Sequence, residues 1–214
     1  MIFPGLVVAS LSAGPSQAAT FLGEFWDVSS ANFSINQALN AIDGVAPTAT
    51  FTSQAIDYPN GATNRQSSSL SLASFLGTDA ASIVGDGTRA VTTSVFRFTG
   101  YVDLLPGQQS FALGSDDGFR LTLDNTVVAQ QNRPRGFRFT NLAADAGDGR
   151  VPFELIFYEN FGRTGLEFFI DNSIIVPASI PVPATAGLGL MGVATLAGLG
   201  MRRRGSDKPL APTG

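Results

Sequence analysis

Residues 98–128 read FTGYVDLLPGQQSFALGSDDGFRLTLDNTVV, and this stretch decides the fold. Apolar and polar residues alternate through it in three short runs, which predicts half-buried β-strands with one face toward a core. Leu105-Pro-Gly107 turns the chain between the first two runs, and Asp124-Asn125 is typical of a tight hairpin after the third. The stretch therefore predicts short, consecutive antiparallel strands.

The same alternation continues on both sides of this stretch. Six runs show it, at residues 91–103, 110–114, 119–124, 136–139, 151–158 and 166–170. Their inward-facing side chains are expected to be Phe96, Phe98, Val102, Phe111, Leu113, Phe119, Leu121, Leu123, Phe137, Phe139, Val151, Phe153, Leu155, Phe157, Leu166, Phe168 and Ile170. Six runs joined by Gly, Asp and Asn turns predict a mainly β protein built as an antiparallel β-sandwich.

The N-terminal part predicts one or two short helices after a first strand at residues 20–28. Ser34-Ile-Asn-Gln37 is a capping box, and the helix that it begins ends at Gly44 and has an apolar face of Ile35, Leu39 and Ile42. Residues 70–76, ended by Gly77, are a second candidate helix. The polar segment at residues 57–69 is expected to form a loop between the two.

Composition excludes several classes of chemistry. The chain has 214 residues, of which 44% are hydrophobic and 14% charged, and this supports a packed core. It contains no Cys and no His, which removes disulfides, thiol nucleophiles, imidazole bases and most zinc sites. A hard-cation site built from oxygen ligands stays possible. Residues 20–180 hold 16 Asp and Glu against 9 Arg, and an acidic body without a basic patch argues against nucleic acid as a partner.

The N-terminus has the features of a secretory signal. Residues 2–13 are apolar, and the small residues Ser16 and Ala18 follow at the spacing that a signal peptidase requires. We therefore expect residues 1–19 to be a signal peptide that is cleaved after Ala18. The alternative is a buried N-terminal strand.

The C-terminal segment, residues 180–214, has three parts. A proline-marked hinge, Ile180-Pro-Val-Pro-Ala184, precedes residues 184–201, which carry no charge and would span roughly 27 Å as a helix. Arg202, Arg203 and Arg204 follow, and basic residues at this position stop translocation and stay cytoplasmic. The pattern predicts a C-terminal transmembrane helix, with the middle of the chain on the far side of the membrane.

This tail resembles the PEP-CTERM class of bacterial sorting signals in its VPLPA-type variant. The matching residues are Pro181, Val182, Pro183 and Ala184, then the apolar span, then Arg202 to Arg204. The resemblance implies that an exosortase-type membrane protease reads the tail and that the protein reaches the cell surface or the extracellular matrix. Ten further residues, Gly205–Gly214, leave open whether the tail is cut or stays as an anchor.

The middle of the chain, residues 20–179, resembles the PA-fourteen domain, the β-sandwich named after anthrax protective antigen. The match runs from Phe98 to Asp171, and its most specific pieces are Gly100-Tyr101, Ser115-Asp-Asp-Gly118, Tyr158-Glu-Asn160 and Gly165-Leu-Glu167. Members of that family occur in adhesins, glycosidases, toxins and bacterial surface proteins. Several bind carbohydrate, and the fungal adhesins do so through calcium.

Asp116 and Asp117 are the candidate site. Adjacent side chains on a regular strand point to opposite faces, so the two carboxylates can meet on one ion only where the backbone is irregular. In the calcium-dependent adhesins of this family the corresponding Asp-Asp peptide is cis. The resemblance thus implies a Ca²⁺ held by Asp116, Asp117, loop carbonyls and one further loop residue, and this ion would chelate vicinal hydroxyls of a glycan. Asn160 is the candidate for that further ligand, because it lies in the Gly-flanked turn at residues 159–164 that follows the strongest predicted strand. The alternative is an ordinary turn in which Gly118 takes a positive φ.

Three other groups are weaker candidates, and the first two have a plain alternative. A basic cluster would either contact acidic polysaccharide or lie in a solvated loop, and it consists of Arg133, Arg135 and Arg138. Trp26 and Tyr101 would either stack on a sugar or belong to the core. A glycosidase pair of carboxylates would have to come from Glu154, Glu159 and Glu167.

These observations predict an exported carbohydrate- or matrix-binding module without enzymatic activity. Two alternatives stay open. One is a structural component of the extracellular matrix or a biofilm that binds nothing small, and the more remote one is an accessory protein of glycoside processing.

Overall fold

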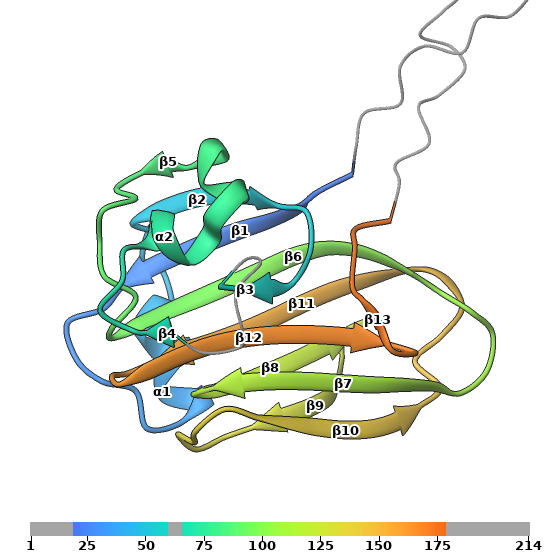
Figure 1. Ribbon diagram of the computed structural model, residues 1–214. Coiled ribbons are helices and arrows are strands. Elements are labelled where there is room, and N and C mark those ends of the chain that lie inside the picture. Colours follow the sequence, from blue (N-terminus) through green and yellow to red (C-terminus); the bar gives the residue numbers. More distant parts are fainter. Residues whose placement is uncertain (1–18, 60–65, 179–214) are drawn as a thin grey trace, which may run out of the picture. The chain divides into compact units, whose positions relative to one another are not determined.

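The computed structural model describes residues 19–59 and 66–178, and their strands form two sheets packed face to face (Figure 1). The first sheet is seven-stranded, and its order is β5 (Val84–Gly85), β2 (Ala49–Ser53), β1 (Phe21–Asp27), β6 (Ser94–Leu104), β11 (Gly149–Glu159), β8 (Gly118–Leu123) and β9 (Thr126–Gln131). The second is six-stranded, and its main path is β10 (Arg138–Ala144), β7 (Gln109–Asp116), β12 (Arg163–Ile170) and β13 (Ser173–Ile174). Two short strands, β3 (Asp57–Tyr58) and β4 (Gln66–Ser67), also pair with β12.

Each strand pairing in the described residues is antiparallel, which confirms the predicted sandwich. The two longest strands, β6 and β11, pair over their full lengths from Gly149 opposite Leu104 to Glu159 opposite Ser94. The Asp124-Asn125 hairpin is confirmed as well, because both residues have positive φ (45° and 60°) and Leu123 pairs with Thr126.

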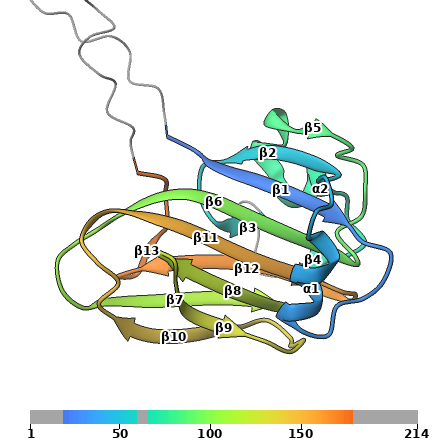
Figure 2. The ribbon, with the colours of Figure 1, turned by 180° about the vertical axis from the view of Figure 1, so that it is seen from behind.

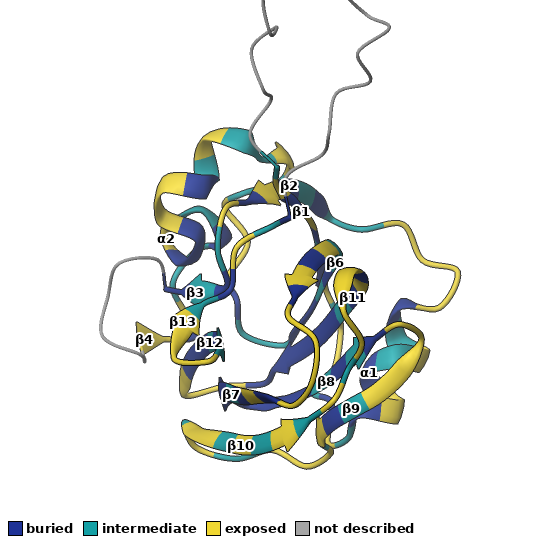
Figure 3. Ribbon diagram, turned by 90° about the vertical axis from the view of Figure 1, so that its right-hand side faces the viewer, coloured by how far each residue is buried: buried dark blue, intermediate teal, exposed yellow. Residues whose placement is uncertain are grey.

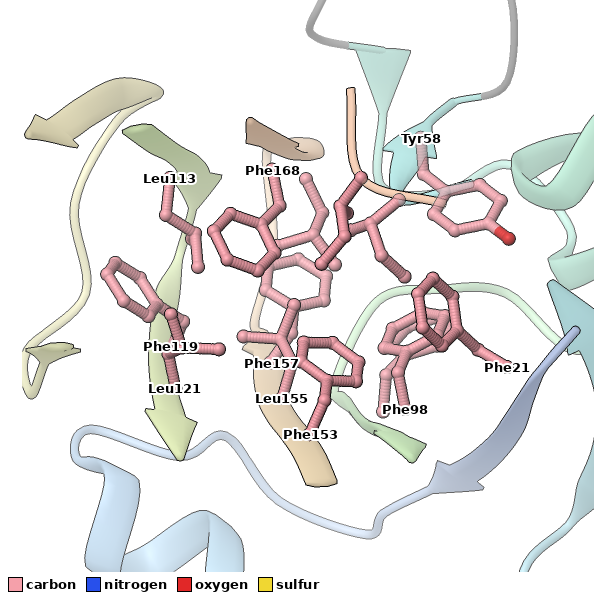
Figure 4. Close-up of a cluster of buried hydrophobic side chains, with 14 of the residues drawn as sticks. Phe21, Tyr58, Phe98, Leu113, Phe119, Leu121, Phe153, Leu155, Phe157 and Phe168 are labelled. Carbon is pink, nitrogen blue, oxygen red and sulfur yellow. The ribbon is translucent and has the colours of Figure 1, made fainter. Parts of the chain in front are cut away.

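Phenylalanine fills the space between the sheets (Figure 4). Leu113 and Phe168 from the six-stranded sheet face Phe119, Leu155 and Phe157 from the seven-stranded sheet. Nearly all side chains that the alternation predicts to face inward are buried, and this follows from the period-two geometry of a strand. Figure 3 shows the same division, with buried residues on the inner faces and exposed ones outside.

Phe137 and Phe139 are the exception, and their predicted inward orientation is wrong. Phe139 is 39% exposed, and Phe137 is half-buried just before β10. β10 is an edge strand that pairs with β7 alone on this sheet, with Phe139 opposite Gly114. The alternation alone cannot tell which face of an edge strand meets the core.

Two short helices accompany the strands, as predicted. Helix α1 (Ile35–Ile42) begins at Ser34, whose side chain accepts a hydrogen bond from the Gln37 N–H, and Gly44 follows it with a φ of 67°. It packs against the outer face of the seven-stranded sheet (Figure 2) through a small apolar cluster that includes Trp26, Ile35, Ala38, Val95 and Ile156. Leu39, which was predicted on the buried face, is only partly buried there.

Helix α2 (Leu72–Leu76) begins at Ser71 and ends at Gly77, which has a φ of 58°. A 3₁₀ turn, η1 (Gly77–Ser82), continues it. The segment predicted as a polar loop between the helices contains β3 and β4. Leu72, Phe75 and Leu76 join the main core, so this half of the chain closes the sandwich next to β2.

Several predictions fall on residues outside the described ranges. These are the signal peptide with cleavage after Ala18, the sorting residues Pro181 to Ala184 and Arg202 to Arg204, and the transmembrane helix at residues 184–201. Within residues 19–59 and 66–178, no helix is long and apolar enough to cross a membrane.

Candidate functional site

The Asp116-Asp117 pair lies where the chain passes from one sheet to the other. Asp116 is the last residue of β7 in the six-stranded sheet, and Gly118 begins β8 in the seven-stranded sheet. The peptide between the two aspartates is cis, as the resemblance implied. Both aspartates are buried, each with only 7% of its surface exposed.

The sequence Ser115-Asp-Asp-Gly118 is therefore not the turn that formed the alternative prediction. Gly118 is not among the described glycines with positive φ, and it lies in a strand opposite Tyr158. A Cβ at this position would lie 2.5 Å from Cε1 of Tyr158 and 2.7 Å from the Gln131 carbonyl oxygen. Glycine is needed here because β8 passes close to a neighbouring ring, not because of its dihedral angles.

Backbone N–H groups from two distant segments hold the aspartate side chains. Asp117 Oδ1 accepts a hydrogen bond from the Arg135 N–H at 3.1 Å, and its Oδ2 accepts one from the Asn160 N–H at 3.0 Å. Asp116 Oδ2 accepts one from the Phe137 N–H at 3.1 Å. The structure thus brings together the three residues predicted as ligands.

Asn160 itself is fixed by a segment that the sequence did not implicate. Its Oδ1 accepts a hydrogen bond from the Asn32 N–H at 2.7 Å, and its Nδ2 donates one to the Asn32 carbonyl oxygen at 2.8 Å. Asn160 is 2% exposed and Asn32 3%. The two residues are 128 positions apart, and only the pairing of β1 and β11 with β6 brings their segments together.

Glu159 adds a third carboxyl group to this cluster. It is fully buried, and its carboxylate oxygens make no well-formed hydrogen bond within the described residues, although the hydroxyl groups of Thr164 and Ser68 are near enough to oppose the rise in its pKa. Burial, reinforced by the negative charges of Asp117 and Asp116, raises the pKa of Glu159 to about 10. Burial also raises the pKa of Asp117, although its backbone donors oppose the shift. The cluster therefore carries more potential negative charge than its surroundings stabilise.

Arg135 supports the loop that covers the Asp pair. Its guanidinium donates to Ser115 Oγ and Thr140 Oγ1, both at 2.9 Å, and lies over the ring of Phe119. The prediction of a solvated loop is thus wrong for Arg135, because the guanidinium ties the loop to β7 and β10. Arg133 and Arg138 are exposed, in agreement with that prediction.

The aromatic candidates divide between core and surface. Trp26 is 3% exposed and donates from Nε1 to the Val45 carbonyl oxygen at 2.8 Å, so it belongs to the apolar cluster under α1. Tyr101 is 51% exposed on β6.

The glutamates predicted as a possible glycosidase pair lie in different surroundings. Glu154 is on the outer face of β11 and contacts Arg120 at 3.3 Å, whereas Glu167 is on β12 in the other sheet. Glu159 lies in the interior. The three glutamates therefore lie on an outer face, in the interior and on the other sheet, and they are not grouped at one site.

The donor set has the chemistry of a hard-cation site. Carboxylate and amide oxygens are the ligands that Ca²⁺ prefers, and a carboxylate oxygen that accepts one backbone hydrogen bond, as both oxygens of Asp117 do, has a second lone pair. The raised pKa values of Glu159 and Asp117 fit a site in which a cation would offset negative charge. Within the described ranges, no group of three or more Asp and Glu side chains converges closely enough to hold a metal alone. Calcium binding would therefore need the amide of Asn160 and backbone carbonyls as well.

Comparison with solved structures shows that the chain has a PA14-like fold. The PA14 domain of the antifreeze protein MpAFP superposes with a TM-score of 0.66 at 22% identity, over 78% of this chain and 92% of that domain. The PA14 sugar-binding domain of an RTX adhesin gives 0.60 at 21%, over 76% of this chain and all of that domain. The A domain of epithelial adhesin 6 from Candida glabrata, solved with Galb1-3GlcNAc, gives 0.54 at 12%, over 79% and 88%. No protein-family model matches the sequence, and no curated protein does.

Proposed function

We propose that this protein is an exported carbohydrate- or matrix-binding module whose glycan site is formed by Asp116, Asp117 and Asn160. One observation carries the proposal, the hydrogen bond from the Asn160 N–H to Asp117 Oδ2 at the point where β7 crosses to β8. This contact joins the Asp pair to the residue after β11, and it supports a shared site at one end of the PA14-like sandwich. The RTX adhesin domain with the same fold is described as sugar-binding, which supports the same role here.

Calcium is the ion that we propose for this site. Asp116 and Asp117 would supply negatively charged ligands, and the side-chain amide oxygen of Asn160 would supply a neutral one. A bound Ca²⁺ would leave coordination positions open to vicinal hydroxyl groups of a sugar. The residues themselves supply a rigid frame, because Asn32 holds the Asn160 amide and Arg135 holds the loop over Asp117.

Thermal melting with and without Ca²⁺ tests the ion site. We expect Ca²⁺ to raise the melting temperature of the wild type, because a ligand that binds only the folded state stabilises it. Asp116→Ala should abolish this rise. Asp145→Ala is the matched control, since Asp145 is exposed in the loop between β10 and β11. Equal calcium-dependent shifts in the wild type and Asp116→Ala would reject the site.

A glycan array, probed with and without Ca²⁺, tests the proposed ligand class. Binding that needs both Ca²⁺ and an intact Asp117 would support the proposal. Binding that survives in Asp117→Asn would place the glycan elsewhere on the protein.

A structural role in the matrix is the second candidate, and under it the side chains of the proposed site would serve the fold of this protein alone. The Asn160 amide is paired with the Asn32 backbone, and both Asp117 oxygens accept backbone hydrogen bonds, so these side chains also join three segments of the fold. This role predicts that Asp117→Asn lowers stability equally with and without Ca²⁺, and that no glycan binds.

Export and sorting are the remaining part of the proposal. The sequence pattern of residues 1–19 and 180–214 supports a signal peptide and an exosortase-read tail that anchors the protein in the membrane, transiently or permanently. Fractionation of bacteria that express the whole chain, beside a chain ending at residue 179, tests this. The whole chain should be found in the membrane or on the cell surface and the shortened one free in the periplasm or medium, whereas identical distributions would argue against a sorting role.

A further inference from the structure

Five phenylalanines in the described ranges lie outside the buried core. Of the 17 phenylalanines of the chain, 16 lie in the described ranges, and 11 of these are buried. The other five are exposed or partly buried, and they are Phe33, Phe137, Phe139, Phe161 and Phe169. Phe33 and Phe161 directly follow Asn32 and Asn160 in the sequence, and the Phe137 N–H donates to Asp116. Phe139 and Phe169 are connected to Phe137 through ring contacts.

Three of the five form a continuous aromatic strip on the outer face of the six-stranded sheet. Phe137 and Phe139 meet edge to face with ring centroids 5.6 Å apart, and Phe139 meets Phe169 at 6.0 Å. Phe139 is on β10 and Phe169 on β12, so the strip crosses the β7 strand that lies between them.

Gly114 is the residue of β7 beneath the strip. It pairs with Phe139 on one side and Glu167 on the other, and a Cβ there would lie 2.6 Å from Cζ of Phe137 and 2.9 Å from Cε1 of Phe139. Ala112, the next residue on this face of β7, is also small. The missing side chain lets the rings lie directly on the sheet while Phe139 stays 39% exposed.

The strip is continuous with the candidate site. Asp116 is on the same face of β7, two residues beyond Gly114, and the N–H of Phe137 donates to its carboxylate. A partly exposed aromatic surface therefore lies directly beside the buried aspartates.

We propose that the Phe137–Phe139–Phe169 strip is a second sugar subsite, so that the protein binds an oligosaccharide and not a single sugar. This inference rests on the proposed function. A pyranose ring has an apolar face of C–H groups that stacks on aromatic rings, and its hydroxyl groups need polar partners at the edge. Asn141 on β10, exposed and opposite Ala112, and Glu167, opposite Gly114, flank the strip with such partners.

The test compares sugars of increasing length by calorimetry in excess Ca²⁺. Two series serve as probes: methyl β-glucoside, cellobiose and cellotetraose, and methyl β-galactoside, lactose and lacto-N-tetraose. We expect at least one series to bind more tightly with length, by roughly tenfold from monosaccharide to tetrasaccharide, which is about the contribution of one aromatic stack. Phe139→Ala should remove most of that gain and change monosaccharide affinity less than about twofold.

Two further variants keep the result interpretable. Phe139→Leu retains an apolar side chain between Phe137 and Phe169 without a ring face, so it should lose the gain even if Phe139→Ala folds poorly. Leu105→Ala is the matched control, because Leu105 is 72% exposed in the turn at the opposite end of β7 and should leave both affinities unchanged.

The outcomes separate this inference from the proposed function. Monosaccharide binding that requires Asp117 but gains nothing with length, or a gain that Phe139→Leu keeps, would overturn the strip as a subsite and leave the proposed function standing. Binding of neither series by the wild type would overturn both. A third outcome is that the wild type sediments as a dimer and Phe139→Ala as a monomer, with no change in sugar affinity. That result would show that the strip contacts a second copy of the chain instead.

Discussion

Within residues 19–59 and 66–178, carboxyl groups are buried in two places, and the two differ in how the charge is stabilised. Asp79 is 3% exposed and stands alone, with its Oδ2 2.7 Å from the Tyr58 hydroxyl and 3.3 Å from the Gln54 nitrogen, both donors. At the other place Asp116, Asp117 and Glu159 are buried together, and their mutual repulsion is part of what raises the pKa of Glu159. Hydrogen-bond donors can stabilise one buried carboxylate. Three in one place need a proton or a cation as well, and this is the physical ground for expecting an ion at the second place only.

The largest effect is expected from a change at Gly118, where the chain passes from β7 to β8 beside the Asp pair. Gly118→Ala places a methyl group against the Tyr158 ring and the Gln131 carbonyl, where there is no space for it. We expect the free energy of unfolding, measured with urea, to fall by about 3 kcal/mol. The variant should also lose the calcium-dependent rise in melting temperature. Gly136→Ala is the control, because nothing lies within 4 Å of a Cβ there. Equal stability of the two variants would show that the junction yields easily.

Removing the Glu159 carboxyl group should change how the stability of the protein depends on pH, and this tests the charge repulsion among the three buried carboxyl groups. The folded-state pKa of Glu159, about 10, is above its ordinary value of 4.5, so folding favours the protonated form. Its contribution to stability is complete below about pH 4.5 and is lost as the pH rises toward 10. In the presence of a chelator, Glu159→Gln should therefore be more stable than the wild type at pH 8, by several kcal/mol, and its melting temperature should decline less as the pH rises. Parallel pH profiles for the two proteins would contradict this assignment.

The single carboxylate should respond differently. Tyr58→Phe removes the hydroxyl that lies between Asp79 and Ser53, and we expect a loss of about 1–2 kcal/mol, because buried hydrogen bonds are lost and Asp79 keeps fewer donors. Denaturation with and without Ca²⁺ should give the same loss. A loss that depends on Ca²⁺ would show that Asp79 is coupled to the Asp116, Asp117 and Glu159 cluster, and this would contradict the proposed difference between the two places.

An exposed carboxylate provides the baseline. Asp103 lies 3.9 Å from Arg150, and its side chain is 61% exposed. Asp103→Asn should change the free energy of unfolding by less than about 0.5 kcal/mol, because water and salt screen such pairs. A larger change, measured by urea denaturation, would contradict the view that this exposed ion pair is screened by water and salt.

Much of the fold could be predicted from local patterns. The alternation in β6, β7, β8, β11 and β12 places their apolar residues on the inner face, and the caps at Ser34 and Gly77 bound the two helices. The short strands β2, β5, β9 and β13 were not predicted, because two to six residues of mixed polarity give too weak a period. The place of β10 at an edge, and so the exposure of Phe139, depends on its neighbours and not on its own sequence.

The candidate site was predicted in part. The Asp116-Asp117 pair is predicted from resemblance to the PA-fourteen family and Asn160 from its position in the turn after a strong strand, and the structure brings these residues together. Asn32 was missed, since nothing around it in the sequence signals a partner 128 residues away. Glu159 was considered only as a catalytic carboxylate, whereas its burial gives it an electrostatic role beside the Asp pair. Arg135 was placed in a solvated loop because a cluster of arginines usually is solvated, and its contact with Ser115 could not be foreseen.

The sequence by itself determined which faces of the strands are apolar, where the helices begin and end, and which chemistry is ruled out by the lack of Cys and His. These are properties of residue type and spacing, and each holds within a window of a few residues. Only the tertiary structure decided that β7 and β8 belong to different sheets, that Asn32 holds Asn160, and that three phenylalanines lie together over Gly114. Such arrangements depend on contacts between segments far apart in the chain, and those contacts form because the whole core must close at once.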